Sequence, residues 1–148
     1  MKMIVLYDYP ASKEIHRELF YLDDSVYISA GQDLAGYLRD MEVQGSASIA
    51  LAVQWRGLVS LALWKSDASK EEIAAFLLSV IPECREILSS CSVEEVFERL
   101  YSEKRFDCLR RLSNSTKRLI DKHLKDKRLK IEVHLVSEAA GNIITSSL

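Results

Sequence analysis

The longest apolar run of the chain extends over residues 46–66 and predicts a β-hairpin. Two stretches rich in residues that suit a pleated surface flank Trp55-Arg56-Gly57, and Arg56 is the only charged residue between positions 47 and 64. Because so apolar a segment must be buried, we expect a central hairpin over about residues 47–64, with the rest of the chain packed around it.

Two turns compete for the loop of this hairpin. A two-residue turn would pair Trp55 with Leu58, but it places Arg56 at a left-handed position that Asn, Asp or Gly usually fills. A three-residue loop with Gly57 left-handed pairs Gln54 with Leu58 and sorts the side chains by size. Its large face contains Ile49, Leu51, Val53, Val59, Leu61 and Leu63, and its small face contains Ser48, Ala50, Ala52, Ser60 and Ala62. We prefer this loop, which predicts a thick core on one face, a closely approaching helix or a second subunit on the other, and Trp55 at the exposed tip.

The spacing of apolar residues predicts the elements on either side of the hairpin. Alternation favours strands at about 3–9 and 26–29, and helical spacing favours a helix at about 11–20 with Ile15 and Leu19 facing inward. Capping-box patterns predict further helix starts at Ser29, Ser69 and Ser92, and a break is expected at residues 113–115 between two more helices.

The chain is expected to end with a strand and a tail. Apolar and polar residues alternate at about 129–136, which predicts a half-exposed or edge strand. The tail, residues 137–148, is small and polar, so it should dock weakly or stay mobile. We therefore expect a single α+β domain over residues 1–136, with a mixed or mainly antiparallel sheet built around the hairpin, covering helices and a helical second half.

Composition favours an intracellular protein. A chain of 148 residues with 48% hydrophobic content can form one ordinary core. The N-terminus has no basic region followed by an apolar signal segment, and the longest apolar run is interrupted at its centre. Three cysteines, Cys84, Cys91 and Cys108, form no close C-x-x-C pair, which favours reduced thiols in the cytoplasm over disulfides or a zinc site.

Charge is distributed unevenly along the chain. Residues 104–130 carry eleven Lys and Arg against three Asp, whereas the whole chain has a net charge of −2. Clustered cations of this kind displace counterions from nucleic acid, so the segment predicts a contact with RNA or DNA phosphates. The candidate residues are Lys104, Arg105, Arg110, Arg111, Lys117, Arg118, Lys122, Lys125 and Arg128. The alternative is a solvated face, or one that docks on acidic protein surface. Tyr7, Tyr9 and Trp55 are candidates for base stacking.

Catalytic chemistry has weaker support in the sequence. Asp8, Asp23 and Asp24 follow or precede predicted strands, and converging carboxylates are the ligands that Mg²⁺ prefers. Asp8 is equally suited to cap the helix that begins near Pro10. Nucleotide-loop and hydrolase motifs are absent, and the three histidines are dispersed. We therefore expect no enzyme activity, no cofactor and no metal.

Two short stretches resemble known families. Ile4-Val-Leu-Tyr-Asp8-Tyr-Pro10 resembles the opening strand of the Cas2 family, and Tyr21-Leu-Asp-Asp-Ser-Val26 resembles the first acidic strand of PIN-domain nucleases. Each resemblance covers about seven residues. The predicted hairpin departs from the parallel PIN sheet, and the chain is longer than the ferredoxin-like Cas2 fold requires. Neither family's function is carried over.

Three functions follow from these patterns. The first is a non-catalytic binding module or small assembly subunit, in which the basic surface at 104–130 contacts RNA or DNA. The alternative is a protein–protein adaptor that forms a homodimer or heterodimer without nucleic acid, with Trp55 and Arg56 as partner-binding residues. The second alternative is a metal-dependent nuclease that uses Asp8 with Asp23 or Asp24. No membrane contact is expected.

Overall fold

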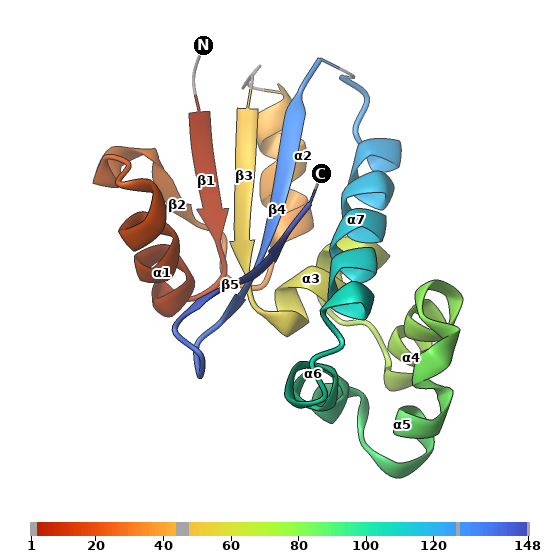
Figure 1. The fold of residues 1–148 in the computed structure, drawn as a ribbon. Helices are drawn as coiled ribbons and strands as arrows, with labels where there is room; N and C mark the ends of the chain where they lie inside the picture. The colour runs from red at the N-terminus through yellow and green to blue at the C-terminus, as the bar shows by residue number, and fades with distance from the viewer. Residues whose placement is uncertain (1–2, 44–47, 127, 148) are drawn as a thin grey trace.

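The strands of the protein form one mixed sheet in the order β2-β1-β3-β4-β5 (Figure 1). The computed structural model describes residues 3–43, 48–126 and 128–147. The strands are β1 (Met3–Tyr7), β2 (Tyr27–Ser29), β3 (Ser48–Val53), β4 (Lys130–Ser137) and β5 (Asn142–Ser146). The first four are parallel, and β5 pairs antiparallel with β4.

Helices cover both faces of this sheet. They are α1 (Pro10–Phe20), α2 (Leu34–Val43), α3 (Trp55–Leu63), α4 (Lys70–Val80), α5 (Arg85–Ser90), α6 (Val93–Ser102) and α7 (Phe106–His123), with short 3₁₀ segments η1 (Asp24–Val26) and η2 (Pro82–Cys84). The larger core lies between one face and α2, α3 and α7, and a smaller core lies under α1 on the other. In Figure 1, α4, α5 and α6 cluster beyond the carboxyl ends of the strands.

The predicted central hairpin is wrong. Residues 48–53 do form a strand, but from Trp55 onward the chain is helix α3 rather than a second strand. Gly57 lies inside this helix, and the glycines with positive φ in the described part of the chain are Gly31 and Gly141. Leu58 and Leu61 are fully buried at helical spacing. A continuous apolar run satisfies both the strand and the helix periodicity, so the pattern alone did not distinguish them.

The small side chains of β3 nevertheless have the predicted role. Ile49, Leu51 and Val53 face the larger core, whereas Ala50 and Ala52 face the smaller one. Helix α1 packs against β3 on this second face, where alanines allow a close approach.

The fold class is therefore α/β with a mixed, mostly parallel sheet. The expected mixed sheet is confirmed, whereas the α+β class, the mainly antiparallel alternative and the central hairpin are wrong. The single domain is confirmed, as are strands near 3–9, 26–29 and 129–136. The last of these, β4, lies between β3 and β5 and is not an edge strand. The tail, expected to dock weakly or stay mobile, supplies the edge strand β5. Among the described helices, none is long and apolar enough to cross a membrane.

Local signals for helix starts succeed in part. Ser69 opens α4 through a reciprocal capping box with Glu72, as predicted. The box predicted at Ser29 does not form, because α2 begins at Leu34 and Asp33 accepts a hydrogen bond from the Gly36 N–H instead. No break occurs at residues 113–115, since α7 runs through them as one helix of 18 residues.

The two residues of α1 that were expected to face inward differ in outcome. Ile15 is partly buried and packs against the smaller core as predicted, but Leu19 is 60% exposed. The fully buried residues beneath the helix are Ser12 and His16, and each one finds a hydrogen-bond partner on the sheet or at the helix start. An apolar pattern does not reveal such buried polar residues.

The strand order places a topological switch point between β1 and β3. The connection from β1 leads to β2 on one side, and the connection from β3 leads to β4 on the other. Neighbouring parallel strands whose connections diverge leave a crevice at their carboxyl ends, where α/β proteins commonly bind ligands. Asp8, at the end of β1, and Gln54, at the end of β3, mark this crevice.

Candidate nucleic-acid interface

Asp8 joins three segments at the switch point. Its Oδ1 accepts hydrogen bonds from the Tyr9 N–H at 2.8 Å and the Ser12 hydroxyl at 2.7 Å, and its Oδ2 accepts one from the Gln54 N–H at 2.8 Å. The side chain is 7% exposed, and this burial raises the pKa of the carboxyl despite the three donors. Asp8 therefore connects the end of β1, the start of α1 and the start of α3.

Gly57 allows α3 to approach this carboxylate. A Cβ added at Gly57 would lie 2.9 Å from Asp8 Oδ2, 3.0 Å from Val53 Cβ and 3.2 Å from Leu34 Cδ1. The first two contacts are closer than side chains normally reach, so the glycine is required by packing. Gly57 was predicted to lie in a turn with a left-handed backbone. It lies instead within α3, where close packing leaves no room for a side chain.

The carboxylates proposed for a nuclease do not gather in the described part of the chain. Asp23 and Asp24 lie at η1, where Asp23 accepts from the Ser25 N–H and Asp24 pairs with Lys13 at 2.7 Å. These contacts lower the pKa of both carboxyls. Neither belongs to a three-ligand cluster with Asp8, whose two oxygens already accept protein donors.

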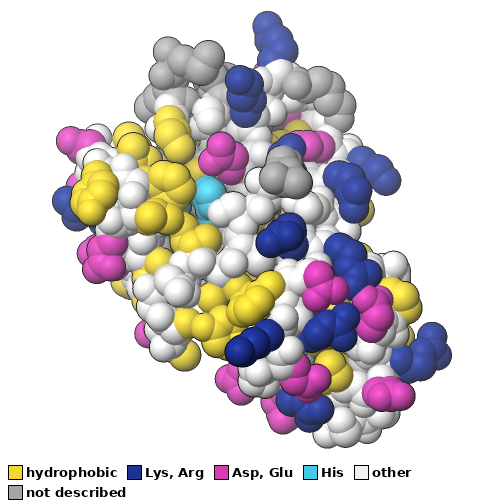
Figure 2. Space-filling view, in the orientation of Figure 1, with side chains coloured by type: hydrophobic (Ala, Val, Ile, Leu, Met, Phe, Trp, Pro, Cys, Tyr) yellow, Lys and Arg dark blue, Asp and Glu magenta, His cyan; other side chains and the backbone are white. Residues whose placement is uncertain are grey.

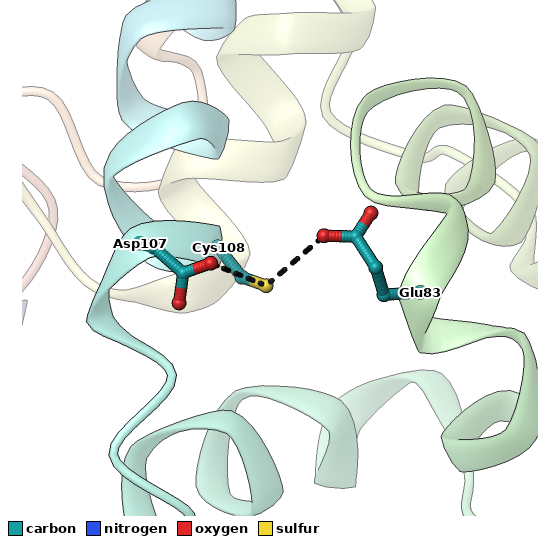
Figure 3. Close-up of side chains that lie close together, drawn as sticks. All are labelled: Glu83, Asp107 and Cys108. Atoms are coloured by element: carbon teal, nitrogen blue, oxygen red, sulfur yellow. Dashed lines mark hydrogen bonds between the residues drawn. The ribbon is translucent and has the colours of Figure 1, made fainter.

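A different cluster forms where α7 begins. Figure 3 shows Glu83 of η2 facing Asp107 and Cys108 of α7, and one ligand atom from each lies within 4.8 Å of the others. The Arg111 guanidinium hydrogen-bonds both Glu83 oxygens and contacts Cys108 Sγ at 3.4 Å, and Arg105 Nε lies 3.3 Å from Asp107 Oδ1.

These arginines define what the cluster does. They lower the pKa of Glu83 and Asp107, and burial raises the pKa of the Cys108 thiol. The thiol is therefore held neutral, and two guanidinium groups supply the positive charge that a metal ion would bring. We therefore assign the cluster a structural role, in which its ion pairs hold α7 against η2.

The nine predicted nucleic-acid-binding cations fall into two groups. Four pair with carboxylates: Arg105 and Arg111 as above, Lys117 with Asp121 at 3.8 Å, and Arg128 with Asp126 at 3.3 Å. The other five are exposed and have no ion-pair partner among the described side chains: Lys104, Arg110, Arg118, Lys122 and Lys125. Figure 2 shows dark-blue side chains following α7 on the face turned to the viewer.

The C-terminal part of this set forms a row. Arg118 and Lys122 are four residues apart on α7 and lie one helical turn from each other, and Lys125 follows the helix end. Arg118 contacts only the Ser115 hydroxyl, at 3.1 Å, among the interactions of the described residues. We call Arg118, Lys122 and Lys125 the basic row.

Trp55 is not at an exposed tip, so the premise that made it a partner-binding candidate is wrong. It is 9% exposed, its Nε1 donates to the Val93 carbonyl at 3.3 Å, and its ring stacks on Phe97 at 5.8 Å. Arg56 is exposed on the first turn of α3 and lines a cavity of about 110 Å³ together with Asp8. The exposed apolar surface lies elsewhere, at the end of α1, where Leu19, Phe20 and Tyr21 are 60%, 41% and 87% exposed.

A larger cavity lies between α6 and the turn that joins β4 to β5. Its volume is about 590 Å³, and Trp55, Phe97 and Tyr101 form one wall. Gln54, Ser137 and Glu138, from the carboxyl ends of β3 and β4, supply the polar wall of the cavity. We call this cavity the aromatic groove. Phe97 and Tyr101 are half-buried, and their position at the cavity depends on tertiary packing that a sequence pattern does not show.

A buried histidine pair lies on the opposite face of the sheet, under α1. His16 Nδ1 and the Tyr27 hydroxyl share a hydrogen bond of 2.7 Å, and His134 Nδ1 and the Ser146 hydroxyl share another of 2.7 Å. The two rings are 5.2 Å apart, His16 Nε2 is buried without a hydrogen-bond partner, and buried His134 Nε2 lies 3.4 Å from Glu132 Oε2. Burial lowers the pKa of both, that of His16 to about 4. No sequence pattern indicates this pair, because the residues are 118 positions apart.

Comparisons with protein-family models, with curated proteins and with solved structures find no match to this chain.

Proposed function

We propose that the protein is a non-catalytic binding module that contacts the backbone of single-stranded RNA or DNA through α7. The observation that carries the proposal is the basic row. Its three cations, Arg118, Lys122 and Lys125, are exposed on one side of the chain and have no ion-pair partner among the described residues. A cation already held by a carboxylate releases few counterions on binding, whereas an unpaired cation can replace the counterions of a phosphate.

The arrangement of charged and aromatic side chains around α7 supports the same function. Near the start of α7, Arg105 and Arg111 pair with Asp107 and Glu83, whereas toward the other end of the helix the basic row has no ion-pair partner among the described residues. Half-buried aromatic rings of α6 lie beside α7, and Tyr101 contacts Phe106 of α7 edge-to-face at 5.7 Å. Aromatic stacking surfaces and unpaired cations on one molecule are typical of proteins that bind single strands.

Removing two charges of the row should weaken binding without unfolding the protein. The variant Arg118→Gln with Lys122→Gln is expected to bind a fluorescein-labelled ten-nucleotide oligouridylate roughly 25-fold more weakly at about 0.1 M salt, because each lost phosphate contact changes the logarithmic salt slope by about 0.7. Fluorescence anisotropy measures the affinity. Glutamine keeps the helix propensity and adds no negative charge at the helix end.

The matched control removes the same charge elsewhere. Lys70→Gln with Arg85→Gln changes two exposed cations at the starts of α4 and α5, and this variant should bind as the unmodified protein does. Equal weakening in the two variants would indicate a diffuse effect of net charge, and unchanged binding in the α7 variant would contradict the proposal.

A further inference from the structure

The aromatic groove combines a stacking surface with hydrogen-bond acceptors. Phe97 stacks on Trp55 at 5.8 Å and on Tyr101 at 6.3 Å, so three rings form a ladder along one wall. Phe97 and Tyr101 are half-buried and present part of their surface to the cavity. A flat, unsaturated group of a ligand can stack there at little conformational cost.

The polar wall of the groove is rich in acceptors. Gln54 Nε2 donates to Glu138 Oε2 at 3.3 Å, which holds the Glu138 side chain toward the cavity. Glu98 and Glu138 are both exposed, and the described residues that line the groove include no Lys or Arg. The groove therefore disfavours a phosphate and favours a ligand whose edge carries N–H donors.

Positive side chains lie at both ends of the groove. At one end, Gln54 and Trp55 also line a smaller cavity with Tyr9 and Arg56. At the other end, Tyr101 contacts Phe106, which lies two residues after the exposed Lys104 in the chain. A strand crossing the groove would thus place phosphates near cations on either side while one base enters the acidic, aromatic centre.

We infer that the aromatic groove binds one unstacked base of the single strand, with a preference for guanine. The inference rests on the proposed function and specifies its base recognition. Guanine carries two adjacent donors, N1–H and N2–H, on its Watson–Crick edge, and a carboxylate such as that of Glu138 accepts both. Adenine and cytosine place an acceptor at the corresponding ring nitrogen, which a carboxylate repels.

Labelled ten-nucleotide RNAs test the inference. The oligonucleotide U4GU5 should bind about tenfold more tightly than U4AU5 or U4CU5, and Glu138→Gln should bring the three affinities close together. Tyr101→Leu should weaken binding of all three by about tenfold, because it removes the stacking ring, and Tyr101→Phe, which keeps a ring, should restore most of that loss. Thermal unfolding of each variant shows whether the fold is intact.

The outcomes separate the groove from the basic row. Equal binding of the three RNAs by the unmodified protein overturns the groove and leaves the proposed function standing. Failure of every RNA to bind at low salt overturns the proposed function. Free nucleotides provide a second test, in which each competes with the labelled RNA for the protein. Stronger competition by guanosine monophosphate than by adenosine monophosphate supports base recognition by the groove. Equal competition by the two overturns it.

Discussion

Replacing Asp8 by alanine is expected to lower the free energy of unfolding by about 3–5 kcal/mol. The substitution leaves the Tyr9 and Gln54 N–H groups and the Ser12 hydroxyl without their acceptor at a buried site. Each hydrogen bond to a buried charged group contributes about 1.5–3 kcal/mol, and part of that sum is offset because the charge itself no longer has to be buried. Urea unfolding followed by tryptophan fluorescence measures the change.

Asp23→Ala is the matched control for this variant. Asp23 caps a three-residue 3₁₀ segment by accepting one exposed hydrogen bond from the Ser25 N–H, so its removal should destabilise the protein far less than removal of Asp8. Asp8→Asn should fall between the two, because an amide keeps the shape but has only one acceptor atom. An Asp8→Ala protein as stable as the unmodified one, or more stable, would show that the carboxylate is a strained functional group and not a structural tie.

Acidification from pH 6.5 to pH 4 is expected to remove about 3 kcal/mol of stability through His16 alone. The pKa of this imidazole is about 4 in the folded protein, because of burial and the nearby His134, against about 6.5 in an unfolded chain. The unfolded state therefore binds a proton that the folded state rejects, and stability present above pH 6.5 is lost as pH falls toward 4. The lowered pKa of His134 acts in the same direction.

The slope of unfolding free energy against pH isolates this contribution. His16→Leu should show a shallower slope than the unmodified protein between pH 6.5 and 4.5, whatever its stability at pH 7. The raised pKa of Asp8 has the opposite sign, but it is present in both proteins and cancels in the comparison. A His16→Leu protein with an unchanged slope would contradict the lowered pKa.

Local chemistry in the sequence predicted the outer elements well. The alternation at 129–136 gives β4, and Ser69 with Glu72 gives the start of α4, because both signals arise from neighbouring residues. The hairpin predicted from the apolar run at 46–66 is wrong for a physical reason. The strand half of this run is fixed by Ala50 and Ala52 facing α1, but the next residues bury Leu58 and Leu61 against other helices. Only the tertiary partners decide between strand and helix there.

The candidate site, like the fold, could be predicted from the sequence only in part. A count of charges located the basic segment, but it did not show that Arg105 and Arg111 form ion pairs with Asp107 and Glu83. Position 83 lies in a different element, and the pairing depends on how η2 packs against α7. The aromatic groove needs four elements, because its walls come from the ends of β3 and β4 and from α3 and α6. No linear pattern brings those residues together.

The salt dependence of oligouridylate binding by the unmodified protein tests the central claim most directly. Three phosphate contacts by Arg118, Lys122 and Lys125 predict that the logarithm of the association constant falls with the logarithm of salt concentration with a slope of about −2. Measurement by anisotropy between about 50 mM and 200 mM salt should give this slope or a steeper one. A slope near zero, or no binding at the lowest salt, would contradict a nucleic-acid contact through α7.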